Sequence, residues 1–157
     1  METRIEPLGR TGTVNVLLVG NNPMDMGGVL DKLKQVRGQR IATEIAFDLK
    51  SILERLLRFQ PNFILIDDNI GRQELMEAVN KLSANRSTRD IPITVLKNSN
   101  YSESFGSTSI LDYLLKQTLS PEDLYKTLKN TLRFRKTQRY LYRAYQTRTG
   151  QLMNALR

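Results

Sequence analysis

The chain of 157 residues contains no cysteine, no histidine and no tryptophan. This excludes disulfides, thiolate or imidazole metal sites, and catalysis by a histidine base or a cysteine nucleophile, so that any metal would need oxygen ligands. No apolar run approaches the length of a membrane span, and the first residues lack the basic and apolar regions of a signal peptide. We therefore expect a cytoplasmic protein with no membrane partner.

The chain has an excess of basic residues, and they gather at one end. Residues 1–123 contain 15 Lys and Arg against 16 Asp and Glu, whereas residues 124–157 contain 9 basic residues and no acidic residue. The length suits one domain with some tail. The asymmetry indicates either a tail that contacts nucleic acid or an acidic partner, or a solvated linker helix.

Short apolar, β-branched runs alternate with stretches of helical spacing along the chain. Strands are predicted over residues 14–19, 41–47, 63–66, 91–96 and 111–115. Helices are predicted after Pro23 and ending before Gly38, over 48–57, over 73–82 and from Ser120 onwards. The polar segment 98–109 is expected to hold only a short or poorly formed helix. Strands and helices in strict alternation predict a parallel sheet covered by helices on both faces.

In such a sheet the working crevice lies outside the carboxyl ends of the strands. Three segments at these ends carry a family resemblance. Residues 61–67 (Pro-Asn-Phe-Ile-Leu-Ile-Asp) resemble the strand that leads to the phosphate-accepting aspartate of response-regulator receiver domains. Residues 91–96 are similar to their fourth strand, and residues 112–116 (Asp-Tyr-Leu-Leu-Lys) to their fifth strand with its lysine. The resemblance spans roughly residues 14–133.

The resemblance implies a fold and a set of roles. The fold class is α/β, a doubly wound five-stranded parallel sheet of order 2-1-3-4-5, here with a basic C-terminal helical extension. Asp67 would be the phospho-acceptor in a bacterial two-component phosphorelay, with a histidine kinase or another signalling protein as partner. The backbone carbonyl of Asn69 would be a metal ligand. Lys116 would be the phosphoryl clamp, and Lys97 and Tyr113 would lie at the switch positions.

Other positions depart from the family pattern. Gly20 and Asn21 replace the acidic pair that holds magnesium, and a neutral amide is a poor substitute for a carboxylate ligand. We expect magnesium, the one cofactor that the resemblance implies, to bind weakly or not at all, with Asn21 at best a degenerate ligand. Lys97 replaces the usual Ser or Thr, so a second ammonium group could pair with Asp67 and neutralise it. Ile70 and Gly71 stand where Met-Pro is usual.

Each of these residues also has a plainer interpretation. Asp67 could be a polar residue that ends a strand, and we expect Asp68 to face solvent. Lys97 is flexible enough to reach water instead of Asp67. Asn21 and Asn22 are equally suited to be turn and cap residues.

We expect a disordered lead-in over residues 1–12, a receiver-like domain over 13–134 and a basic helical tail or linker over 135–157. The tail interleaves cations with aromatic rings, a composition typical of segments that bind phosphates and stack on bases. The residues concerned are Arg133, Arg135, Lys136, Arg139, Tyr140, Tyr142 and Arg143. The same pattern suits a helix that pairs with a partner, including a second copy in a homodimer, or a linker to an output domain.

The leading functional hypothesis is a receiver, degenerate in its metal site, that acts by protein–protein contact and is not an enzyme. One alternative is a receiver that is still phosphorylated on Asp67 despite the altered site. Another is a basic scaffold or nucleic-acid-binding regulatory module that acts through the tail.

Overall fold

The computed structural model describes residues 12–99 and 109–155. Five parallel strands form one sheet of order β2-β1-β3-β4-β5, which confirms the predicted fold class. The strands are β1 (Thr13–Val19), β2 (Arg40–Ala46), β3 (Phe63–Asp67), β4 (Ile93–Lys97) and β5 (Ile110–Leu115). The α-helices are α1 (Pro23–Lys34), α2 (Leu49–Leu56), α3 (Arg72–Ala84) and α4 (Pro121–Ala155). Two short 3-10 helices, η1 (Asp68–Ile70) and η2 (Lys116–Thr118), follow β3 and β5.

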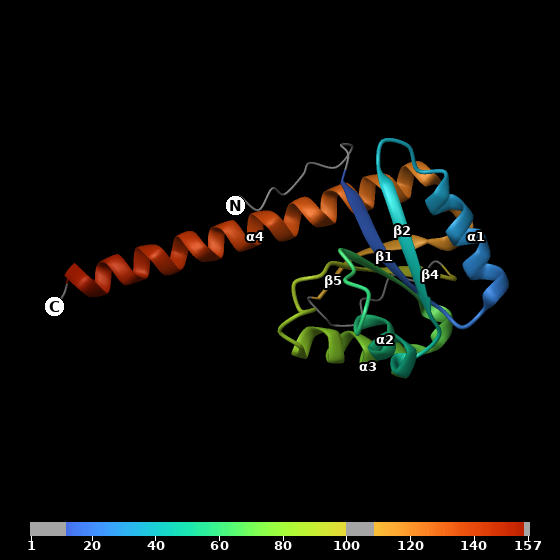
Figure 1. Ribbon diagram of the computed structural model, residues 1–157, viewed down its shortest axis with the longest axis horizontal. Helices are drawn as coiled ribbons and strands as arrows, with labels where there is room; N and C mark the ends of the chain where they lie inside the picture. The colour runs from blue at the N-terminus through green and yellow to red at the C-terminus, as the bar shows by residue number, and fades with distance from the viewer. Residues whose placement is uncertain (1–11, 100–108, 156–157) are drawn as a thin grey trace.

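The helices cover the sheet from both sides, α1 and α4 on one face and α2 and α3 on the other (Figure 1). Successive side chains of a strand point to opposite faces, so β3 supplies a core residue to each layer in turn. Ile64 and Ile66 pack toward α2 and α3, whereas Phe63 and Leu65 pack toward α1 and α4. All five residues of β3 are buried, which explains why this run reads as nearly continuous apolar sequence.

Local sequence fixes most of the element boundaries. The Asn22 side chain accepts hydrogen bonds from the backbone N–H groups of Met24 and Asp25 and caps α1, with Pro23 at its first position. Asp48 caps α2 through a reciprocal pair of hydrogen bonds with Ser51. Gly71 begins α3 with a φ of 96°, a conformation that favours glycine.

Two sequence predictions are wrong in detail. The fourth strand begins at Ile93 instead of Ile91, and Pro92 contributes only its carbonyl oxygen, which accepts from the N–H of Ile64. The spacing of Leu49, Ile52, Leu53, Leu56 and Leu57 predicts one apolar face for α2, which is too wide, because Leu53 and Leu57 are 45% and 86% exposed while Ile52 is buried. At about 100° per residue, Leu57 turns away from the face that Ile52 shares with the sheet.

Several expectations fall outside the described residues, namely the disordered lead-in up to residue 11 and most of the polar segment 98–109. The expected boundary after residue 134 lies inside α4, a single helix of 35 residues. Among the described helices, none is long and apolar enough to cross a membrane.

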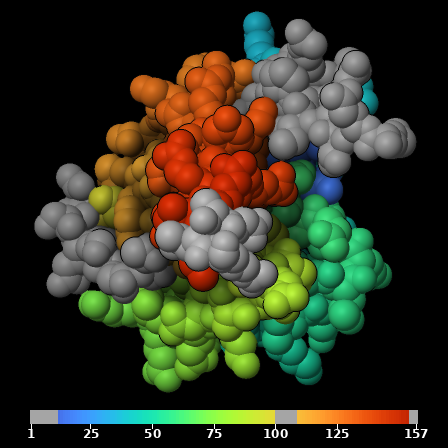
Figure 2. Space-filling view, turned by 90° about the vertical axis from the view of Figure 1, so that its left-hand side faces the viewer, coloured from blue at the N-terminus to red at the C-terminus, as the bar shows by residue number. Residues whose placement is uncertain are grey.

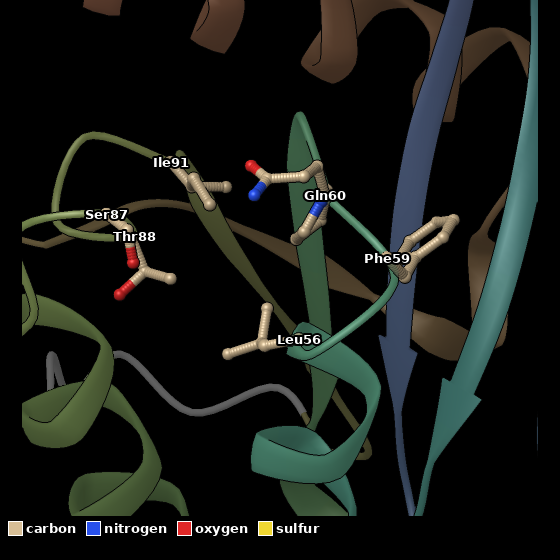
Figure 3. A pocket seen from close by; sticks show the side chains of 7 residues that line it. Leu56, Phe59, Gln60, Ser87, Thr88 and Ile91 are labelled. Atoms are coloured by element: carbon tan, nitrogen blue, oxygen red, sulfur yellow. The ribbon is translucent and has the colours of Figure 1, made fainter.

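A small cavity of about 20 Å³ lies between the end of α2 and the loop before β4 (Figure 3). Its lining includes Leu56, Phe59 and Ile91, and the room suffices for about one water molecule. It lies at the amino ends of β3 and β4, and its volume is too small for a larger ligand.

Candidate functional site

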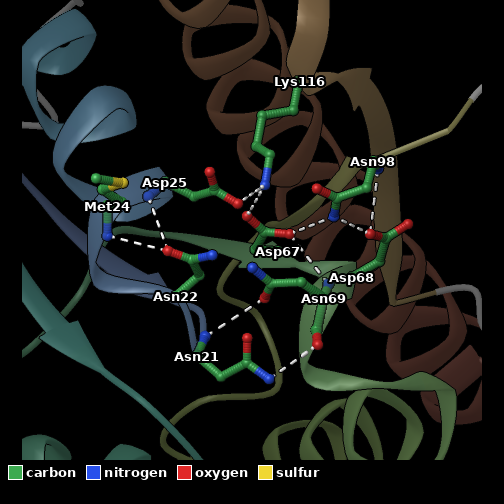
Figure 4. A network of polar contacts seen from close by, with 9 residues as sticks. All are labelled: Asn21, Asn22, Met24, Asp25, Asp67, Asp68, Asn69, Asn98 and Lys116. Carbon is green, nitrogen blue, oxygen red and sulfur yellow. Dashed lines mark hydrogen bonds and ion pairs between the residues drawn. The ribbon is translucent and has the colours of Figure 1, made fainter.

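The polar residues that end the strands meet at one edge of the sheet. Val19 of β1 pairs with Ile66 of β3, and Asp67 pairs with Leu96 of β4, so the carboxyl ends of the inner strands lie level. Around this edge lie the residues that we call the Asp67 site (Figure 4). They are Asn21, Asp25, Asp67, Asp68, Asn69, Asn98 and Lys116.

Asp67 is the buried centre of this site, with 1% of its surface exposed. Its Oδ1 accepts hydrogen bonds from the backbone N–H of Asn69 at 3.0 Å and from the Asn98 side chain at 2.6 Å. Its Oδ2 pairs with Nζ of Lys116 at 2.7 Å. Both carboxylate oxygens therefore have close partners inside the protein, as a buried charge requires.

Lys116 joins two elements that are far apart in sequence. Its Nζ lies 2.7 Å from Asp67 and 2.9 Å from Oδ2 of Asp25, which is in the first turn of α1. Burial alone would lower the pKa of Lys116, but the hydrogen bonds and charges of Asp25 and Asp67 outweigh it and raise that pKa above its ordinary value. The ammonium group is thus held in its charged form between two carboxylates.

Asn98 bridges Asp67, the last residue of β3, and Asp68, which follows it. Its side-chain NH₂ donates to both Asp67 and Asp68, and its backbone N–H donates to Asp68 at 3.1 Å. The prediction that Asp68 faces solvent is therefore wrong, because Asp68 is half-buried against the first residue after β4. This bridge connects the ends of β3 and β4.

Asn21 is bonded to the residue that the resemblance assigned to the metal. Its side-chain Nδ2 donates to the backbone carbonyl of Asn69 at 2.9 Å, and its backbone N–H donates to the side-chain oxygen of Asn69 at 3.4 Å. An N–H donor thus points at the oxygen that would face a cation. Next to it, Nδ2 of Asn69 is buried without a hydrogen-bond partner among the described residues.

This arrangement does not fit magnesium, which needs about six oxygen ligands in near-octahedral geometry. The Asn69 carbonyl is taken by the Asn21 amide, and the Asp67 carboxylate by Lys116 and Asn98. A side chain in place of Gly20 would be crowded, since its Cβ would lie 3.3 Å from Cβ of Asp67. Across residues 12–99 and 109–155, no group of three carboxylates is close enough to hold a metal.

The structure separates the remaining predicted site residues from Asp67. Within the described part of the chain the bonds of the Asp67 carboxylate go to Lys116, Asn98 and Asn69, and none goes to Lys97. Tyr113 of β5 packs against the apolar cluster under α2 and α3. The predicted residues of the basic tail all lie on α4, which leaves the body on the face opposite α3. Most of them are exposed, but Arg135 is half-buried.

Sequence reasoning missed Asp25 and Asn98. Asp25 carries a signal in retrospect, because a carboxylate three residues after the Asn22 cap faces the carboxyl ends of the strands. Asn98 directly follows Lys97, and nothing in the sequence distinguishes this amide from the charged residue before it as the partner of Asp67.

The sequence matches no protein-family model, and no curated protein matches it significantly. Solved structures do match. The receiver domain of a sensor histidine kinase from Pseudomonas aeruginosa, solved with magnesium coordinated in its active-site cleft, is 19% identical with a TM-score of 0.65. The match covers 77% of this chain and 98% of that domain.

Two further matches are response regulators. A chemotaxis response regulator of Vibrio cholerae is 21% identical over 76% of this chain and 99% of its own, with a TM-score of 0.63. A two-component response regulator of Legionella pneumophila is 24% identical over 76% of this chain and 98% of its own, also with a TM-score of 0.63. The chain has the fold of response-regulator receiver domains.

Proposed function

We propose that the chain is a receiver domain of a two-component signalling pathway that works by protein contact, not as an enzyme and not through magnesium-dependent phosphoryl transfer. Asp67 occupies the acceptor position of such a domain. The observation that carries the proposal is the pairing of Asn21 with the Asn69 carbonyl, because it puts a hydrogen-bond donor where a metal would need an oxygen.

The state of Asp67 supports the same conclusion. A carboxylate that attacks a phosphorus atom must present an oxygen to the donor molecule, and the charge on the transferred group must be neutralised. Asp67 is 1% exposed, and both of its oxygens are bonded. Lys116 already divides its charge between Asp67 and Asp25. The site thus holds the acceptor in a paired, water-excluded state.

In this proposal the partner is a histidine kinase or another signalling protein that recognises the receiver fold by its surface. Asp67 and Lys116 then serve stability and shape instead of chemistry. The network joins α1, β3, β4 and β5 at one edge through Asp25, Asp67, Asn98 and Lys116. A surface built on these elements would keep one conformation without a phosphoryl switch.

The test is intact-mass spectrometry of the wild type and of Asp67→Asn after exposure to an acyl-phosphate donor or beryllofluoride, with and without magnesium. A receiver domain of known activity, treated in parallel, shows that the reagents are competent. We expect no Asp67-dependent mass increase in a sample that is folded by circular dichroism. A mass increase that requires both Asp67 and magnesium would refute the proposal and establish a phosphorylated receiver.

A second candidate function is binding of nucleic acid through α4, favoured by the exposed basic residues and the absence of any acid after residue 123. Such binding should weaken steeply with salt, since phosphate contacts release counterions. Heparin retention that is lost on deletion of residues 134–157 would support it. Retention that survives the deletion would exclude the tail as its source.

A further inference from the structure

The last part of α4 stands clear of the rest of the molecule. We call residues 136–155 the extension; at 1.5 Å per residue it is about 30 Å long (Figure 1). Every side chain from residue 136 to residue 153 is exposed. Figure 2 looks onto its C-terminal end and shows α4, in orange to red, above the yellow-green α3. The extension therefore gains no stability from packing on its own domain.

An unsupported helix of this length is marginal in water, because most helical stability in proteins comes from packing of an apolar face. The extension nevertheless carries large apolar side chains. Leu141, Tyr145 and Leu152 are 60%, 70% and 61% exposed, and Phe134 at its base is 50% exposed. These side chains identify a face that a partner would cover.

Four of the seven large apolar side chains that are exposed on the described part of α4 lie on one stripe with a regular spacing, and Tyr140, Tyr142 and Met153 lie outside it. Residues 134, 138, 141, 145, 148 and 152 follow one another at intervals of four and three, so they lie within roughly 40° of a common line along the helix. The members of this stripe are Phe134, Gln138, Leu141, Tyr145, Arg148 and Leu152. The intervals read the same in both directions, with their centre at residue 143.

The basic side chains of the extension lie mostly on its other side. Lys136, Arg139 and Arg143 are roughly 140–200° from the middle of the stripe. A partner that covers the stripe meets few of the charges, which removes the main objection to pairing two basic helices.

We propose that the stripe binds the stripe of a second copy of this chain, with the two extensions antiparallel and related by a two-fold axis near residue 143. In this register Phe134 faces Leu152 of the second copy, and Leu141 faces Tyr145. Arg148 then faces Gln138. A parallel pair would instead place Arg148 against Arg148, a like-charge contact that the antiparallel pair avoids.

The area of the stripe sets the strength of this pair. Four large side chains, each at least half exposed, offer on the order of 500 Å² per helix. Two copies together bury roughly 1,000 Å², the low end for specific interfaces. We therefore expect a dimer that dissociates on dilution, with a dissociation constant of about micromolar order. The proposal does not depend on the chemistry of Asp67.

Sedimentation of the full chain over a range of concentrations tests the pair. Tyr145→Ser and Leu141→Ser should each weaken the dimer about tenfold or more, because the two-fold axis makes each substitution remove two contacts. Tyr140→Ser is the matched control, since Tyr140 is 71% exposed, like Tyr145, but lies on the other side of the helix. A wild type that stays monomeric, or a control that weakens the dimer equally, would overturn the proposal.

The absence of cysteine allows the register to be measured directly. In a glutathione buffer, a mixture of Gln138→Cys and Arg148→Cys chains should form a disulfide-linked heterodimer, while Gln138→Cys alone should not. Cα atoms joined by a disulfide lie about 4.4–6.8 Å apart, and residue 138 of one copy is about 15 Å from residue 138 of the other in this register. A Gln138→Cys homodimer would contradict the antiparallel arrangement. A monomer that instead binds an oligonucleotide through residues 136–157 would assign the extension to nucleic acid.

Discussion

The Asp67 site and the extension of α4 differ in whether their side chains have partners within the chain. At the site, a buried carboxylate is bonded to Lys116, Asn98 and Asn69, and every one of these partners comes from the same chain. On the extension, side chains from residue 136 to residue 153 are exposed, large apolar ones among them.

This difference indicates where each region works. A buried polar network that is satisfied internally stabilises one conformation, and it has little left with which to bind a ligand. An exposed apolar stripe contributes a favourable free energy only when another surface covers it and removes it from water. The contrast supports our proposals that the edge of the sheet stabilises the molecule itself and that the extension binds a second molecule.

The largest expected effect is the loss of the cation from the site. Lys116→Met leaves Asp67 buried and without its ion pair, so we expect the free energy of unfolding to fall by about 3 kcal/mol. Lys97→Met is the matched control, because Lys97 also ends a strand but does not bond to Asp67. Chemical denaturation measures both, and an equal loss of unfolding free energy in the two variants would contradict a specific role of the Lys116–Asp67 ion pair.

Removal of the amide that bridges Asp67 and Asp68 comes next. Asn98→Ala deletes the side-chain hydrogen bonds to two carboxylates and leaves them facing each other. Hydrogen bonds to charged groups contribute about 1.5–3 kcal/mol, and we expect a loss of roughly 2 kcal/mol. Denaturation at neutral pH measures it. No loss would show that water replaces the amide without cost.

A carboxylate at position 21 should allow the Asp67 site to bind magnesium. Asn21→Asp removes the donor to the Asn69 carbonyl and turns a carboxylate toward that oxygen, which should cost about 1 kcal/mol without metal. Millimolar magnesium should then raise the melting temperature of the variant and leave that of the wild type unchanged. A wild type that is stabilised equally would show that the present amide already serves as a ligand.

The pH dependence of the site follows from Lys116. Because its pKa is raised in the folded protein, its contribution to stability is complete below its ordinary pKa of 10.5 and is lost as the pH rises through the folded-state value. The difference in unfolding free energy between wild type and Lys116→Met should be constant from neutral pH to about pH 9.5. It should shrink above that range, and a difference that grows there would contradict the ion pair.

The smallest effect on stability should come from removal of the extension of α4. Deletion of residues 136–157 removes side chains that are exposed as far as residue 153. At protein concentrations too low for association, we expect the unfolding free energy of the body to change by less than about 0.5 kcal/mol. A larger loss would mean that the extension folds back and stabilises its own domain.

The sequence predicts the fold well because each strand and helix shows its own period. Five apolar runs that alternate with segments of helical spacing predict a parallel sheet. Asp67 and Lys116 are also predictable, since Asp67 ends β3 and Lys116 directly follows β5, with only β4 between these strands. Their contact at 2.7 Å needs only the register of β3, β4 and β5.

The rest of the site depends on distances that a one-dimensional pattern does not contain. Asn98 and Lys97 are adjacent, and only the path of the chain after β4 decides which of them reaches Asp67. Asp25 lies on a helix, where its contact with Lys116 depends on how α1 packs on the sheet. The predicted apolar face of α2 is too wide for the same reason: the sheet covers Ile52 but not Leu57, and the sequence pattern does not show this difference.

The most direct test of the central claim is a magnesium titration of the wild type followed by the backbone and side-chain amide signals in ¹H–¹⁵N NMR spectra. If the Asn21 amide occupies the place of a metal, the signals of Asn21, Asn69 and Asn98 should not move up to about 10 mM magnesium, a concentration well above what a specific site needs. Saturable shifts of these three residues at low millimolar magnesium would show that the site binds the metal and would contradict the account.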